Sequence, residues 1–223
     1  MLRTICILAA FSCFAFLCSC QKEADINTPP PTTDTTTANG SYMPITAGTY
    51  WVYKDSGFSN SYDTSTVLGE DTVINNINFT KVHTVSAIED NYGFYGIKDH
   101  NYYLHANESG FTVTMLILND TMSVGNTWVY DMGTINNVPT RGTGTIVEKL
   151  KTFTVQGETY SDVIHTQYVM AFNIMGAYTD IATYHFYFAK GKGVIKVNSN
   201  ITDFTGGGND VIASQDLIDY SIK

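Results

Sequence analysis

The sequence predicts an all-β fold of antiparallel sheets, arranged either as a β-sandwich or as a curved, barrel-like sheet. From Ser41 onward, short runs rich in Thr, Val, Ile, Tyr and Phe are separated by Gly, Asn and Asp, as in successive strands and turns. No helical apolar periodicity is sustained over more than two turns in this region. Only Pro44 and Pro139 interrupt it, which suits a sheet that needs its backbone N–H groups as donors.

Three blocks recur in the same order and predict that the β-rich domain, residues 41–223, consists of two degenerate repeats, about 41–120 and 121–223. GTYWVY returns as GNTWVY after 77 positions, VINNINFTKV is echoed by TVQGETYSDV after 81, and YYLHA by HFYFA after 83. The blocks occupy 48–53 and 125–130, 73–82 and 154–163, and 102–106 and 185–189. Loop insertions would produce this slow increase in offset.

The second block predicts two tight hairpins. Asn75-Asn76 in the first repeat and Gln156-Gly157 in the second stand where a two-residue turn would join two paired strands. These pairs tolerate the positive φ that such turns require.

Both tryptophans of the chain, Trp51 and Trp128, occupy equivalent positions in the first block. Because side chains alternate along a strand, each Trp should share a face with the Tyr two positions later, Tyr53 or Tyr130, while the intervening Val faces away. These four aromatic residues are the candidate ligand-binding residues, as a stacking platform for carbohydrate. The alternative is packing in the core, and the alternation favours burial of both indoles, which would then hold the sheets together.

The N-terminus predicts a secretion signal over residues 1–19. Arg3 precedes an apolar run, residues 5–17, that at about 13 residues is too short for a helix spanning a bilayer, which needs roughly 20. The run ends in Leu17-Cys18-Ser19-Cys20, which resembles the bacterial lipobox. The resemblance implies that Cys20 receives a diacylglycerol, that the signal is removed, and that the new amino terminus is acylated, so that several chains hold the protein stably in the membrane.

Residues 20–40 predict an extended tether. The stretch is dominated by Thr and Pro, which cannot bury enough apolar surface to order a fold. Gln21-Lys22-Glu23 resembles the surface-export signal of Bacteroidetes lipoproteins. The resemblance implies a lipid-anchored protein of the outer membrane, with its β-rich domain exposed at the cell surface.

The sequence predicts no catalytic residue, metal site or cofactor. It contains no Gly-Xaa-Ser-Xaa-Gly elbow, all four cysteines lie at or before Cys20, and neither the histidines nor the carboxylates have a spacing that pairs them. The formal net charge of −9 argues against nucleic acid as a partner.

The GxxWxY pattern, together with the later run AKGKGVIKV at 189–197, resembles Bacteroidetes lipoproteins with GxxWxY and GxGxxK patterns. This resemblance implies a β-rich envelope protein and supplies no catalytic residues. We therefore expect a lipid-anchored lipoprotein with a binding or structural domain, whose partners are the membrane and a glycan or envelope protein. Two alternatives stay open: an envelope hydrolase with a site built from distant residues, and a carrier that encloses an apolar ligand in a curved sheet.

Overall fold

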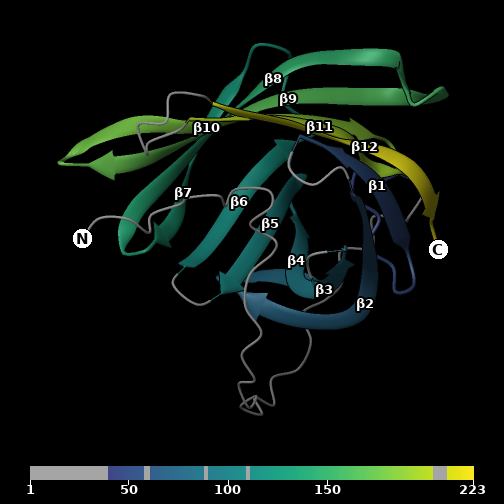
Figure 1. Ribbon diagram of the computed structural model, residues 1–223, viewed down its shortest axis with the longest axis horizontal. Helices are drawn as coiled ribbons and strands as arrows, with labels where there is room; N and C mark the ends of the chain where they lie inside the picture. The colour runs from purple at the N-terminus through teal and green to yellow at the C-terminus, as the bar shows by residue number, and fades with distance from the viewer. Residues whose placement is uncertain (1–39, 58–60, 88–89, 109–110, 203–209) are drawn as a thin grey trace.

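The computed structural model describes residues 40–57, 61–87, 90–108, 111–202 and 210–223. Cys20, the predicted signal and the tether up to residue 39 lie outside these residues. The described part of the chain forms twelve antiparallel strands in a closed barrel (Figure 1). The predicted all-β antiparallel fold is therefore confirmed, in its curved, barrel-like form. The described residues include no helix long and apolar enough to cross a membrane.

Each strand pairs with the next along the chain, and β12 pairs with β1 to close the barrel. The strands are β1 (Tyr50–Ser56), β2 (Tyr62–Ile74), β3 (Ile77–Val85), β4 (Asp90–Lys98), β5 (Asn101–Glu108), β6 (Phe111–Asn119), β7 (Thr127–Ile135), β8 (Val138–Val155), β9 (Glu158–Ile174), β10 (Ala177–Ala189), β11 (Gly193–Ile201) and β12 (Val211–Ser221). Because consecutive strands are neighbours in the barrel, the order needs no crossover, and only β12 and β1 pair without a turn or loop between them.

The two predicted hairpin turns are confirmed. Asn75 and Asn76 have φ of 50° and 60° between β2 and β3, and Gln156 and Gly157 have φ of 49° and 87° between β8 and β9. Positive φ at both central residues matches the right-handed twist of the strands that they connect. The residue types of these turns thus fix the register of both hairpins.

The first two recurring sequence blocks fall on equivalent strands if each repeat contains six strands. Trp51 lies on β1 and Trp128 on β7, and the two turns join β2 to β3 and β8 to β9. The third block does not follow this scheme, because residues 102–106 lie on the fifth strand of the first six and residues 185–189 on the fourth of the second. The duplication itself stays a prediction.

The barrel has a weak seam between β6 and β7. These strands pair only where residues 111–113 meet residues 133–135, so the rest of β6 has no ladder partner on that side. Side chains from β7 and β9 bond to its carbonyls instead: Trp128 Nε1 donates to Leu116 O at 2.8 Å, and Thr166 Oγ1 to Ile117 O at 3.3 Å. Trp128 thus joins the two sides of the seam.

The segment 40–49 closes one end of the barrel, which we call the tether end. The carbonyl of Ser41 accepts a hydrogen bond of 2.7 Å from the backbone N–H of Gly191, in the turn between β10 and β11. The side chain of Met43 is buried in the core. The opposite end, which we call the distal end, is where the chain passes from β1 to β2, from β3 to β4 and from β11 to β12.

Candidate functional site

The barrel encloses a cavity between β1–β5 on one side and β10–β12 on the other. The centres of water-sized molecules can occupy about 70 Å³ of it, several times the 10–15 Å³ needed for one water. Its lining residues are Met43, Trp51, Tyr53, Asp63, Ser65, Val82, Thr84, Gly93, Tyr95, Leu104, Phe186, Gly193, Val194, Val197 and Gln215. The cavity therefore has an apolar and aromatic body with a few polar groups, the usual composition of a small-molecule site.

Two of the four predicted aromatic residues line this cavity. Trp51 is 1% exposed, its Nε1 donates to the carbonyl of Lys192 at 2.6 Å, and its ring lies against Gly193, where a Cβ would be 3.1 Å from Nε1. The hydroxyl of Tyr53 donates to the carbonyl of Val194 at 2.9 Å. Because both polar atoms are bonded to the backbone of the same region, the rings present their apolar surfaces to the cavity.

The other two aromatic residues lie elsewhere. Trp128 is 7% exposed at the seam, and its indole occupies the space where a side chain on Gly144 would otherwise stand. Tyr130 packs against Tyr103, with ring centroids 5.8 Å apart. The prediction that both indoles are buried is confirmed. Ligand binding by Trp128 and Tyr130 stays a prediction, and neither residue lines the cavity.

Polar groups gather toward the distal end of the cavity. Asp63 accepts hydrogen bonds from Gln215 Nε2 at 2.9 Å and from Ser61 Oγ at 3.4 Å. Burial raises the pKa of the Asp63 carboxyl above its ordinary value, and the nearby carboxylate of Asp55 raises it further, whereas the two hydrogen bonds lower it. Asp55 itself is buried. Two acidic side chains thus lie close together in a partly desolvated place.

Asn91 is the next polar group at this end. Its side chain is 6% exposed, and within the described part of the chain neither its amide nitrogen nor its amide oxygen has a hydrogen-bond partner. The residue pairs with Thr84 across β3 and β4, and the alternation along β4 places it on the same face as Gly93 and Tyr95, which line the cavity. An unmet buried amide costs about 1–3 kcal/mol, so this position calls for a polar partner from outside the chain.

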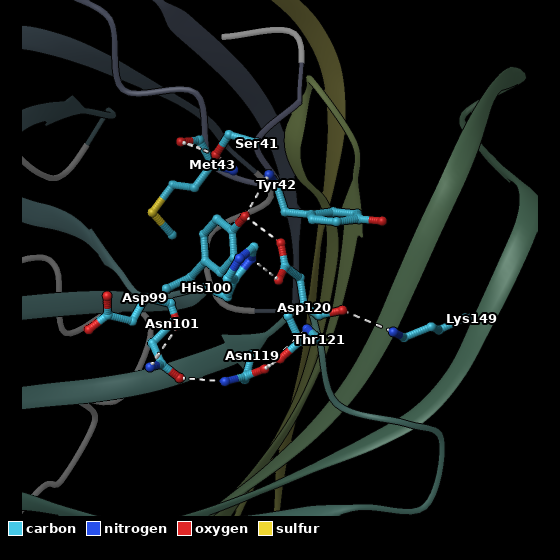
Figure 2. Close-up of polar contacts among 11 residues, drawn as sticks. Ser41, Tyr42, Met43, Asp99, His100, Asn101, Asn119, Asp120, Thr121 and Lys149 are labelled. Carbon is cyan, nitrogen blue, oxygen red and sulfur yellow. Dashed lines mark hydrogen bonds and ion pairs between the residues drawn. The ribbon is translucent and has the colours of Figure 1, made fainter. Parts of the chain in front are cut away.

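The tether end carries a separate polar cluster around Asp120 (Figure 2). The carboxylate of Asp120 accepts from Tyr102 Oη at 2.8 Å and from His100 Nδ1 at 2.9 Å, while its backbone carbonyl accepts from Lys149 Nζ at 2.9 Å. Burial and the bond to Asp120 raise the pKa of the Tyr102 phenol, which therefore stays protonated. Tyr42 packs edge-on against Tyr102, so the cluster fastens the segment 40–49 to the barrel.

A third cluster lies on the outer face of β8–β10. Glu148 Oε1 and His165 Nδ1 are 2.9 Å apart, and His165 Nε2 is 2.9 Å from His185 Nδ1. The two ring nitrogens of His165 thus bridge the carboxylate of Glu148 and the ring of His185. Burial and His165 lower the pKa of His185. Within the described ranges, no three His, Cys, Asp or Glu side chains gather closely enough to hold a metal ion.

The residues that sequence reasoning missed are Asp55, Asp63 and Asn91. One signal was present: Asp55 follows Trp51 and Tyr53 at intervals of two, so the alternation that places the aromatic rings also places this carboxylate on their face. Nothing in the sequence indicates that β2 and β4 bring Asp63 and Asn91 to the same end.

The fold is similar to a crystal structure of a protein from Parabacteroides distasonis that is provisionally described as a lipoprotein. The two proteins are 10% identical with a TM-score of 0.51, over 82% of this chain and 99% of the other. At that identity the similarity shows the fold alone. No protein-family model matches this chain, and no curated protein matches it.

Proposed function

We propose that the protein is a lipid-anchored lipoprotein of the bacterial outer membrane whose barrel binds a small molecule in its interior cavity. The lipobox-like residues ending at Cys20 support the anchor, and the structural similarity to a Parabacteroides protein described as a lipoprotein supports the class. The fold by itself does not specify a ligand. The cavity is the observation that carries the binding function.

Among the functions that the sequence left open, the cavity favours a binding protein or carrier. Well-packed interiors contain few voids larger than a water molecule, yet this barrel keeps one that is lined by Trp51, Tyr53 and Tyr95. The side-chain amide of Asn91 has no hydrogen-bond partner in the described part of the chain. It therefore provides a polar group of the kind that fixes the orientation of a ligand in such sites.

The position of the segment 40–49 supports an orientation relative to the membrane. The tether joins the described chain at residue 40, at the tether end of the barrel, where Met43 forms part of the cavity wall. The polar groups Asp55, Asp63 and Asn91 each lie within two residues of the distal end of their strands. The polar end of the cavity would thus face away from the bilayer.

The test is to fill the cavity. Gly93 lines it from β4, its φ is not positive, and β-branched residues suit strands, so Gly93→Val should occupy the space without strain on the backbone. We expect 1-butanol to give saturation-transfer signals in NMR with the full-length protein and to lose them with Gly93→Val, at an unchanged melting temperature. Equal signals from both proteins would contradict binding in the cavity.

A further inference from the structure

The charge that faces the cavity is acidic. Asp63 is the only charged residue among the described residues that line it, and Asp55 lies close enough to raise the energy of its ionised form. Lys196, on β11 next to the lining residue Val197, forms an ion pair with Asp216 of β12. This pair lies on the opposite face of the sheet from Val197 and Gln215. No described lining residue therefore supplies a positive charge to compensate the two carboxylates.

Two partly desolvated carboxylates at close range are unfavourable unless a proton or a cation compensates them. The hydrogen bonds from Gln215 and Ser61 stabilise the ionised form of Asp63 but bring no charge. A bound cation would relieve the repulsion from Asp55 and would favour the ionised form of Asp63.

Asn91 provides an independent observation at the same end. Its buried amide oxygen has no donor and its amide nitrogen no acceptor. An ammonium group carries three N–H donors, enough to reach a carboxylate and the oxygen of Asn91 together. The distal end of the cavity thus offers acceptors from β2 and β4.

The aromatic wall suits the same ligand. Trp51, Tyr53 and Tyr95 border the cavity, and an aromatic face attracts a cation by about 0.5–2 kcal/mol, depending on desolvation. Burial raises the pKa of Tyr95 to about 12, so this phenol is neutral at physiological pH. Beyond the rings, Met43, Val82 and Leu104 offer an apolar surface to the remainder of a ligand.

We propose that the cavity selects a small organic cation, an amine with a short apolar chain, whose ammonium group lies between Asp63 and Asn91. This proposal rests on the proposed function, since it requires that the cavity binds a ligand at all. The apolar chain extends toward Met43 at the tether end.

The test compares three probes of nearly equal size that differ in charge: n-butylammonium, 1-butanol and butyrate. We measure their affinities for the full-length protein in detergent by calorimetric titration. We expect n-butylammonium to bind at least tenfold more tightly than 1-butanol, and butyrate to bind most weakly. Asp63→Asn, which keeps the shape and removes the charge, should abolish the preference for the cation. Asp180→Asn, at an exposed position on β10, is the matched control and should leave it unchanged.

The pH dependence provides a second measurement. The ammonium stays charged below about pH 10, so its affinity follows the ionisation of Asp63, whose pKa is raised. Affinity should be full at neutral pH and should fall as the pH drops through that value, whereas 1-butanol should show little change. The other titratable groups facing the site are Asp55 and the phenols of Tyr53 and Tyr95, and the phenols do not ionise in this range.

The outcomes separate the two proposals. Equal or tighter binding of 1-butanol or butyrate in the wild type, abolished by Gly93→Val, would overturn the cation proposal and leave the proposed function standing. An unchanged cation preference in Asp63→Asn would also overturn it. If none of the three probes binds to the wild type, both proposals fail.

Discussion

Replacing Trp128 with alanine should destabilise the barrel by about 3–5 kcal/mol, the usual cost of truncating a buried tryptophan. The indole is 7% exposed, and its Nε1 donates to the carbonyl of Leu116. That carbonyl lies on the part of β6 that has no ladder partner on β7. Alanine would therefore leave a cavity and a buried acceptor without its donor, and the unmet acceptor alone costs about 1–3 kcal/mol.

Trp128→Phe separates these two contributions. Phenylalanine retains most of the apolar volume but donates no hydrogen bond, so we expect a loss of about 1–3 kcal/mol. Urea denaturation measures the free energy of unfolding, and each kcal/mol should also lower the melting temperature by about 2–4 °C in a domain of this size. Val129, the next residue, is 63% exposed, so Val129→Ala should change stability by no more than about 0.5 kcal/mol. If Trp128→Ala is no more destabilising than this control, the tryptophan does not hold the seam.

Two further predictions concern the anchor and the outer histidines. Cys20→Ala should leave the protein unlipidated, so that it no longer fractionates with membranes; a mature terminus found elsewhere by mass spectrometry would refute lipidation at Cys20. The fold lowers the pKa of His185. At pH values below the unfolded pKa of about 6.5, the unfolded state therefore binds the proton more readily than the folded state. Stability should thus fall as the pH drops from 7 toward 5, and His185→Gln should reduce this fall; equal slopes for the wild type and His185→Gln in denaturation series would contradict the assignment.

Much of the fold could be predicted because strand signals are local. Alternation identified the faces of β1 and β7, and the turn pairs at 75–76 and 156–157 identified two hairpins with the positive φ that the structure shows. Closure of the barrel could not be predicted, because it depends on pairing between β1 and β12, whose residues are far apart in the chain. A sandwich and a barrel place the same alternating residues inside.

The site was less accessible to sequence reasoning for the same reason. Trp51 and Tyr53 stood out as aromatic residues, but their role depends on what the other strands bring beside them. Asp63 and Asn91 have no signature of their own, since an acidic or amide residue near a strand end is ordinary in a turn-rich protein. Only the register of β1 to β4 shows that they meet at one end of a cavity.

The uneven pairing around the barrel means that the first and last strands are held together more firmly than β6 and β7. Every residue from Tyr50 to Ser56 on β1 has a partner on β12, whereas β6 and β7 share only three paired positions. The backbone N–H of Lys223 also donates to Thr49 Oγ1 at 3.2 Å, so Lys223 lies beside the residue that precedes β1. The stretch 121–124 is therefore a suitable place to cut the chain, because a circular permutant opened there would keep both the pairing of β1 with β12 and the cluster around Asp120.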